Sequence, residues 1–205
     1  MLRIYDTLRS GNAWKVRLLA GMLDVPLQRV TLSIDEGDLQ TADFGRINPR
    51  RQVPVLELDD GRHISESFAI LAYLAHGTPF LPVGRYELAT VLSWLSFEQA
   101  THMPPLSSAR LHLALRKDRS EDEAEVQAWQ RAGHQALQTL EQHLSEQQSR
   151  DLVWLSGTCP TIADVALYPY TRLAPMGGVM LDDYPCIGRW LAGVEAIPGY
   201  SPLTY

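Results

Sequence analysis

Residues that could take part in chemistry lie at three points of the sequence where a strand or a helix is expected to begin or end. The first is the loop of residues 7–12, which leads from a short apolar segment into a helical pattern. The start of a helix carries unpaired N–H groups and about half a positive charge, so it stabilises an anion such as a thiolate. Ser10 could donate its hydroxyl to that anion. Alternatively, Ser10 or Asn12 serves only as the helix cap.

Two residue pairs further along could hold a peptide-like ligand. Val53 and Pro54 open an apolar run, where a proline fits an edge strand or a cis peptide bond that turns the backbone toward a ligand. Glu66 and Ser67 open a helical pattern, where the hydroxyl and backbone N–H groups can hold a carboxylate and the acidic side chain can meet an ammonium. That combination matches an amino-acid head group. Ordinary capping and the preference for charge in a first turn explain the second pair equally well.

Hydrophobic periodicity indicates the elements that position these residues. The pattern predicts, in order, a strand at 2–5, a helix from 13 to just before Pro26, a strand at 28–34, a loose helical turn within 36–48, strands at 53–58 and 63–64, and a helix at 66–76. The strand, helix and strand at the start have the length of a right-handed crossover unit, so those two strands should pair in parallel. The order is therefore β-α-β-α-β-β-α.

The remainder of the chain has a helical pattern. Glycines and prolines between 77 and 84 interrupt the periodicity, which predicts a domain at 1–78, a linker at 79–84 and a helical domain at 85–205. Ser120 with Glu123 and Thr161 with Asp164 have the spacing of capping boxes, each before an amphipathic helix. We assign both pairs to folding.

Composition excludes several classes of function. The chain has 205 residues and 23.0 kDa, with 45% hydrophobic and 20% charged residues, which is typical of one or two ordinary folded domains. The net charge of −6 gives no general attraction to nucleic acid or to a membrane surface. Charged residues stand close to the start of the sequence, at Arg3 and Asp6, and no run of about 20 apolar residues occurs. We therefore expect neither an export signal nor a membrane span.

Cysteine and histidine usage restricts the chemistry further. Cys159 and Cys186 have neither C-x-x-C spacing nor a disulfide framework, which is typical of a cytoplasmic protein. No cysteine lies in the first half of the chain, so the chain supplies no thiol to the loop of residues 7–12. The histidines lack metal-ligand spacing, and no metal is expected.

Taken in order, four motifs resemble those of the cytosolic glutathione transferases, and the resemblance extends over essentially the full chain. The chain resembles a bacterial-type member with a Ser-Gly-Asn active-site loop. The motifs are Ser10-Gly11-Asn12, Asn48-Pro49 leading to Val53-Pro54-Val55-Leu56, Ser65-Glu66-Ser67 with Ile70 and Tyr73-Leu74, and Thr161-Ile162-Ala163-Asp164.

This resemblance implies an α/β thioredoxin-like N-terminal domain, an all-α C-terminal domain and a homodimer. It implies that Ser10, assisted by Asn12, stabilises the thiolate of glutathione, which then attacks an electrophilic small molecule. Val53 would pair its backbone with the cysteinyl part beside a cis Pro54, and Glu66 and Ser67 would hold the γ-glutamyl group. Gln52 stands where relatives often carry a lysine, so the glycine carboxylate would meet Gln52, Arg50 or Arg51. The acceptor pocket would include His102, Met103 and Leu106.

Other interpretations stay open on the same scaffold. One is a glutathione-dependent disulfide-bond reductase or isomerase, and another is a non-catalytic binding protein, because a fold alone does not establish activity. A peroxide could replace the electrophilic carbon as acceptor. A tyrosine mechanism is not expected, because Tyr5 lies inside the first predicted strand.

Overall fold

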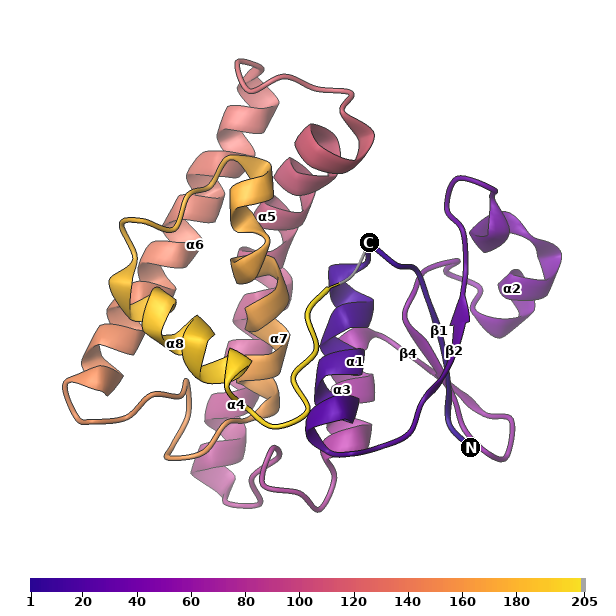
Figure 1. Ribbon diagram of the computed structural model, residues 1–205, viewed down its shortest axis with the longest axis horizontal. Coiled ribbons are helices and arrows are strands. Elements are labelled where there is room, and N and C mark those ends of the chain that lie inside the picture. The colour runs from indigo at the N-terminus through magenta and orange to yellow at the C-terminus, as the bar shows by residue number, and fades with distance from the viewer. Residues whose placement is uncertain (204–205) are drawn as a thin grey trace. The chain divides into compact units, whose positions relative to one another are not determined.

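The computed structural model describes residues 1–203 and divides into two compact units (Figure 1). The first unit contains Met1–Thr78 together with the segment from Ile197 onward, and the second contains Pro79–Ala196. The first holds a four-stranded sheet and its helices, whereas the second is helical. The predicted fold class, an α/β domain followed by an all-helical domain, is confirmed. Residues 79–84, predicted as a linker, group with the helices.

The sheet has the strand order β2-β1-β3-β4. Its strands are β1 (Arg3–Asp6), β2 (Gln28–Thr31), β3 (Val55–Glu57) and β4 (His63–Ser65). β1 and β2 pair in parallel, as the crossover unit predicts, with Ile4 opposite Arg29. β3 runs antiparallel to β1, with Leu56 opposite Ile4, and pairs with β4 as a hairpin. The predicted order β-α-β-α-β-β-α is confirmed.

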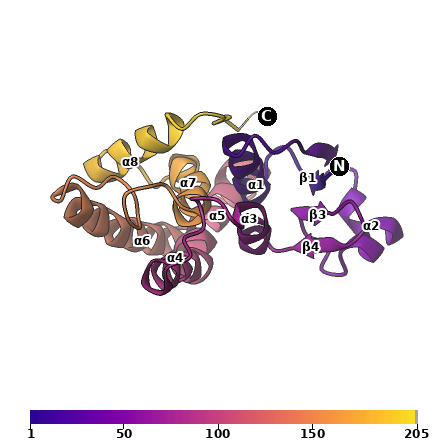
Figure 2. The same cartoon turned by 90° about the horizontal axis from the view of Figure 1, so that it is seen from below.

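The helices of the first unit cover both faces of the sheet. They are α1 (Gly11–Met22), the 3-10 turn η1 (Asp38–Gln40), α2 (Ala42–Ile47) and α3 (Ser67–Ala75). Figure 2 shows α1 and α3 side by side on one face and α2 on the other. Ile4, Leu56 and Ile70 are completely buried in this core. Burial of such side chains provides most of the stabilisation of a small sheet domain.

β2 is shorter than the alternation of residues 28–34 predicts. The strand ends at Thr31, and the carboxylate of Asp38 accepts the Ser33 N–H at 2.8 Å. A backbone hydrogen bond from Gly37 N–H to the Ile34 carbonyl (3.1 Å) then closes a turn, and Ile34 is 58% exposed. Local side-chain bonding has replaced the sheet ladder here, and the apolar Ile34 is left only partly covered.

Residues 197–203 lie with the first unit. The indole Nε1 of Trp14 donates to the carbonyl oxygen of Ser201 at 2.8 Å. The backbone also crosses α1 closely, since a Cβ at Gly21 would lie 2.4 Å from the carbonyl oxygen of Gly199. A side chain at Gly21 would therefore push this segment away from α1.

The second unit consists of α-helices, short helical turns and the irregular loops between them. The helices are α4 (Arg85–Phe97), α5 (Met103–Arg110), α6 (Ala124–Gln148), α7 (Ile162–Arg172) and α8 (Pro185–Glu195). The turns are η2 (Glu98–His102) and η3 (Leu111–Arg116), which are π-helical, and η4 (Ala174–Gly177), a 3-10 turn. Within residues 1–203, no helix combines the length and apolar character needed to cross a membrane.

One of the two predicted capping boxes forms and the other does not. Thr161 caps α7, and the Asp164 carboxylate accepts a hydrogen bond from the Thr161 N–H at 2.8 Å, so this box is confirmed. Ser120 does not cap α6, because that helix begins at Ala124 after Glu123. The Glu123 carboxylate still accepts the Ser120 N–H at 2.9 Å, so only half of that motif is present and it forms an exposed turn outside the helix.

Asp164 does more than complete a cap. It is fully buried and also accepts hydrogen bonds from the Leu155 N–H at 3.0 Å and the Trp190 Nε1 at 2.9 Å. Burial raises the pKa of Asp164, while these donors act in the opposite direction. The carboxylate therefore joins the 155–161 loop, α7 and α8.

We expect Asp164→Ala to lower the free energy of unfolding of the helical unit by about 3 kcal/mol or more, because several buried donors would lose their acceptor. Urea denaturation followed by tryptophan fluorescence measures this change. The matched control is Asp182→Ala, at an exposed carboxylate, which should change stability by less than about 0.5 kcal/mol. Equal losses in the two variants would contradict the structural role of Asp164.

Candidate active site

The loop between β1 and α1 ends in a helix cap made by Ser10. Its Oγ accepts the Ala13 N–H at 3.1 Å, and its own N–H donates to the Thr7 carbonyl at 3.3 Å. The cap uses a lone pair of the hydroxyl oxygen, and no described residue accepts the hydroxyl proton. Ser10 can therefore cap α1 and donate to an anion in front of the helix at the same time.

A buried ion cluster fixes the end of β1 just before this loop. Asp6 is completely buried, and its carboxylate accepts hydrogen bonds from Arg17 on α1 and from Arg29 on β2, the latter at 3.1 Å. Burial lowers the pKa of Arg17, and the neighbouring Asp6 carboxylate opposes that shift. The cluster ties the strand end to both flanking elements, so the loop starts from a fixed point.

Asn12 lies in the first turn of α1 and contacts a buried lysine. Lys15 is completely buried, and its Nζ donates to the Asn12 Oδ1 at 2.7 Å. An ammonium group can only donate, so the amide oxygen of Asn12 must face Lys15 and the amide nitrogen must face elsewhere. No described residue accepts from that nitrogen. Asn12 thus keeps two N–H donors for a ligand.

Tyr5 is engaged away from this loop. Its hydroxyl donates to the Glu57 Oε2 at 2.6 Å, and the Arg3 Nη1 donates to both oxygens of the same carboxylate. Burial and the hydrogen bond to Glu57 raise the pKa of Tyr5. The Tyr5 hydroxyl is committed to a cross-strand contact, in keeping with the prediction that it does not act on the thiol.

The residues before β3 form a turn that exposes backbone groups. The Val53–Pro54 peptide bond is cis. Asn48, which is buried, holds the turn by donating to the Gln52 carbonyl at 2.8 Å and accepting the Arg50 N–H at 3.1 Å. Within the described chain, neither the N–H nor the C=O of Val53 forms a hydrogen bond. Both groups are available to an extended ligand that pairs like a short strand.

The start of α3 combines backbone strain with polar groups. Glu66 precedes the helix with φ 69° and ψ 120°, a conformation that non-glycine residues rarely adopt. Ser67 is the first helical residue and is buried. Glu66 forms an ion pair with Arg50. Strain of this kind persists where the surrounding structure enforces it and is enriched at ligand sites.

Gln52 and Arg51 occupy different environments. Gln52 is exposed, whereas Arg51 has φ 53° and donates to the carbonyls of Leu39 (3.4 Å) and Thr41 (3.1 Å). Arg51 therefore anchors the segment before α2. Its predicted contact with glutathione stays a prediction, as does that of Gln52.

The predicted acceptor residues lie in the second unit. His102 and Leu106 are buried, and Met103 is half-buried. The Thr171 hydroxyl donates to the Leu167 carbonyl, so at 2.8 Å the His102 Nε2 must be the donor to the Thr171 oxygen. His102 and Leu106 are interior residues in this structure. The acceptor role of the three residues stays a prediction.

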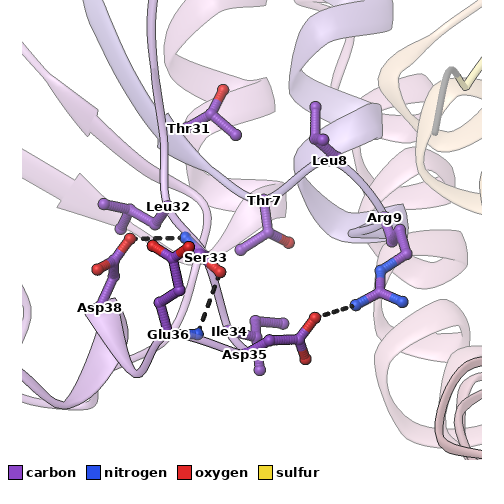
Figure 3. Close-up of a pocket in the computed structure, with 10 residues that line it drawn as sticks. All are labelled: Thr7, Leu8, Arg9, Thr31, Leu32, Ser33, Ile34, Asp35, Glu36 and Asp38. Carbon is purple, nitrogen blue, oxygen red and sulfur yellow. Dashed lines mark hydrogen bonds and ion pairs between the residues drawn. The ribbon is translucent and has the colours of Figure 1, made fainter.

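A cavity of about 430 Å³ opens beside the β1–α1 loop, entirely within the first unit (Figure 3). Its walls are residues 7–9, which directly precede Ser10, and residues 31–36 with Asp38, which follow β2. Arg9 and Asp35 form an ion pair across it at 3.2 Å. Among the described residues, no group of three or more His, Cys, Asp or Glu side chains is placed to hold a metal ion.

Sequence reasoning missed three features of this region. Lys15 lies three residues after Asn12, a helical spacing that could have indicated their contact. Local spacing could not show that Thr7 and Asp38 line one cavity, because that cavity depends on how the two loops meet. The position of Asn48 before Pro49 marked it in the sequence, but the sequence did not show that its side chain bonds to Gln52 and Arg50.

The fold and the site together define a thioredoxin-like domain that presents two polar helix starts and a free backbone segment, joined to a helical domain. The sequence also matches two known domain families that correspond to these two domains. Residues 9–76 match the glutathione S-transferase N-terminal domain, and residues 123–193 match the glutathione S-transferase C-terminal domain.

Individual relatives support the same assignment. A maleylacetoacetate isomerase from Pseudomonas aeruginosa is 30% identical over 97% of this chain and 93% of its own length. A glutathione S-transferase from Pseudomonas fluorescens has a crystal structure that is 36% identical, with a TM-score of 0.93, covering 100% of this chain and 99% of that one. Ure2p in complex with S-p-nitrobenzylglutathione, at 23% identity, covering 97% of this chain and 91% of that one, shares the fold with a TM-score of 0.88. The chain belongs to the glutathione S-transferase family.

The strain at Glu66 gives a test of its role. We expect Glu66→Gly to leave the free energy of unfolding unchanged or to raise it by about 1 kcal/mol, because relief of strain offsets the freedom that glycine adds to the unfolded chain. The same variant should lose retention on immobilised glutathione.

The matched variant is Glu66→Gln, which keeps the strained backbone and the shape of the side chain. It should be no more stable than the natural protein and should bind glutathione more weakly because it lacks the charge. Urea denaturation and column retention report both properties. A Glu66→Gly protein that is destabilised yet still retained would contradict a ligand-binding role.

Proposed function

We propose that this protein activates the thiol of glutathione for attack on an electrophilic small molecule. The observation that carries the proposal is the start of α1, where Ser10 caps the helix and keeps its hydroxyl proton for a ligand. No cysteine lies in the first unit, so the sulfur must arrive with the ligand. Membership of the glutathione S-transferase family supports glutathione as that ligand.

The magnitude of thiol activation follows from the groups at this position. A decrease of one pKa unit corresponds to about 1.4 kcal/mol of preference for the thiolate. One charge-assisted hydrogen bond contributes about 1.5–3 kcal/mol and a helix start about 0.3–1 kcal/mol. Together these contributions come to about 2–4 kcal/mol, so Ser10 at the start of α1 accounts for a decrease of about one to three pKa units.

Asn12 is the second donor in this proposal, and Lys15 is a positioning residue for it. The 2.7 Å contact from Lys15 to Oδ1 turns the amide N–H groups away from the helix interior. Because Lys15 is buried, water competes little for this contact. The fixed amide can add a second hydrogen bond to the sulfur or to the neighbouring backbone of glutathione.

The rest of the tripeptide would lie along the first unit. The γ-glutamyl carboxylate would meet Ser67 and the backbone N–H groups at the start of α3, and its ammonium would meet Glu66. The free N–H and C=O of Val53, beside cis Pro54, would pair with the cysteinyl residue. Gln52, Arg50 or Arg51 would face the glycine carboxylate.

In the transferase reaction the thiolate forms a sulfur–carbon bond as the leaving group departs with its electron pair. The thiol proton goes to solvent before attack. Holding the thiolate beside the acceptor supplies several kcal/mol of the rate enhancement. With a peroxide acceptor the same thiolate would instead attack oxygen.

A second candidate is isomerisation with glutathione as a cofactor. It is favoured by the likeness to maleylacetoacetate isomerases from Pseudomonas aeruginosa and, at 29% identity, from Mus musculus. In that reaction glutathione is recovered unchanged, whereas a transferase consumes it. Measuring free glutathione against product by NMR separates the two, and a disulfide acceptor tests the reductase alternative.

We also infer a homodimer from family membership. Helices α3 and α4 each expose large apolar side chains, among them Tyr73 at 45% and Tyr86 at 80%. Such exposed apolar residues are typical of association surfaces. Light scattering after gel filtration would give the mass in solution, and a monomer at micromolar concentration would contradict this inference.

Replacing Ser10 tests the central chemistry. Ser10→Ala should raise the pKa seen in the pH profile of kcat/KM by about one unit, because the thiolate loses its hydroxyl donor. Below the pKa of the natural complex the rate should fall about tenfold, and the two proteins should converge at a pH well above both pKa values.

Ser10→Thr is the matched control, since threonine keeps both the hydroxyl and the capping oxygen. It should retain a near-natural pH profile. If Ser10→Ala leaves the profile unchanged, Ser10 has no role in activation and Asn12 becomes the main partner, to be tested by Asn12→Ala.

A further inference from the structure

The cavity beside the β1–α1 loop is lined by residues that no step of the proposed function uses. At about 430 Å³ it lies within the size range of small-molecule sites. One wall is preformed, because Asp38 accepts the Ser33 N–H at 2.8 Å and the Ser33 Oγ accepts the Glu36 N–H at 3.2 Å (Figure 3). These bonds hold the 33–38 segment in place without a ligand.

Among the described residues, one buried polar atom in the wall of this cavity lacks a hydrogen-bond partner. Thr7 is only 4% exposed, and within the described chain its Oγ1 has no hydrogen bond. Figure 3 shows the Thr7 side chain extending from the first loop toward the 33–36 segment. A buried hydroxyl without a partner costs free energy, which a ligand with a hydrogen-bonding group would recover.

The charges around the cavity restrict what that ligand can be. Arg9 is paired with Asp35 at 3.2 Å, which leaves Glu36 and Asp38 as the excess charge of the lining. A carboxylate in this space would face net negative charge, whereas a neutral or cationic molecule would not. Leu32 and Ile34 supply apolar wall for a carbon skeleton.

The cavity is also next to the proposed nucleophile. Its residues 7–9 directly precede Ser10, and the Ser10 N–H to Thr7 carbonyl bond folds that loop into one turn. A molecule bound there lies against the loop that presents the thiolate partner.

We propose that this cavity binds the acceptor, and that it selects neutral or cationic electrophiles carrying a group that accepts a hydrogen bond from Thr7. The inference rests on the proposed function and names its substrate class. It separates this chain from an enzyme whose acceptor is a carboxylate, which the negative lining would disfavour.

The first test compares chloronitrobenzenes that differ only in a carboxamide, a trimethylammonium or a carboxylate substituent. The kcat/KM of each is divided by its uncatalysed rate constant with glutathione, which removes intrinsic reactivity and the charge of glutathione itself. We expect the carboxamide and the trimethylammonium compound to be favoured over the carboxylate by about threefold or more. Equal or reversed preference overturns the proposal.

Two substitutions assign that preference to the cavity. Glu36→Lys should abolish it, while Glu146→Lys, the same charge change at an exposed site on α6, should leave it intact. Thr7→Val should lower kcat/KM for the carboxamide about three- to tenfold without raising the KM for glutathione. Its Tm should not fall, because the lost hydroxyl has no partner in the fold.

Binding measurements keep this inference separate from the proposed function. Calorimetric titration of the three compounds into protein saturated with S-methylglutathione needs no thiol chemistry. The same charge order and the same Thr7→Val loss are expected there. If binding follows this order but no thiol is activated, the proposed function fails while the cavity assignment stands; binding without any order, or no binding, overturns the cavity assignment.

Discussion

The unpaired N–H groups at the start of α1 are the feature on which the site depends. They can stabilise an anion only if the helix starts at a fixed place, and the buried Asp6 carboxylate fixes it by binding Arg17 on α1 and Arg29 on β2. The sheet core around Ile4 holds that strand end in turn. The positions of Ser10 and Asn12 are thus a consequence of packing beneath them.

The other half of the site depends on backbone that the fold holds in unfavourable conformations. Arg51 and Glu66 both have positive φ, and each has contacts that maintain it: Arg51 through the Leu39 and Thr41 carbonyls, Glu66 through Arg50 and the first turn of α3. Side-chain bonds from Asn48 shape the segment between them. Glycine at these positions would fit the backbone more easily but would lack the charged groups.

Sequence patterns predicted what depends on neighbours in the chain. The cap at Ser10, the box at Thr161 and Asp164, and the β-α-β-α-β-β-α order all follow from spacing within a few residues. The sequence patterns predicted too long a strand for β2, because the Asp38 carboxylate binds the Ser33 N–H in place of a neighbouring strand. They could not show the Thr7 cavity, because it forms where two loops meet, nor the burial of Lys15, because a lysine on a helix is ordinarily exposed.

The central claim is that glutathione becomes more acidic when bound in front of α1. Titrating the thiolate absorbance of the glutathione complex against pH, with the free tripeptide as reference, measures this directly. We expect a pKa lowered by about one to three units, in line with a hydroxyl donor and a helix start acting on one sulfur. A bound thiol with the same pKa as free glutathione would contradict the account.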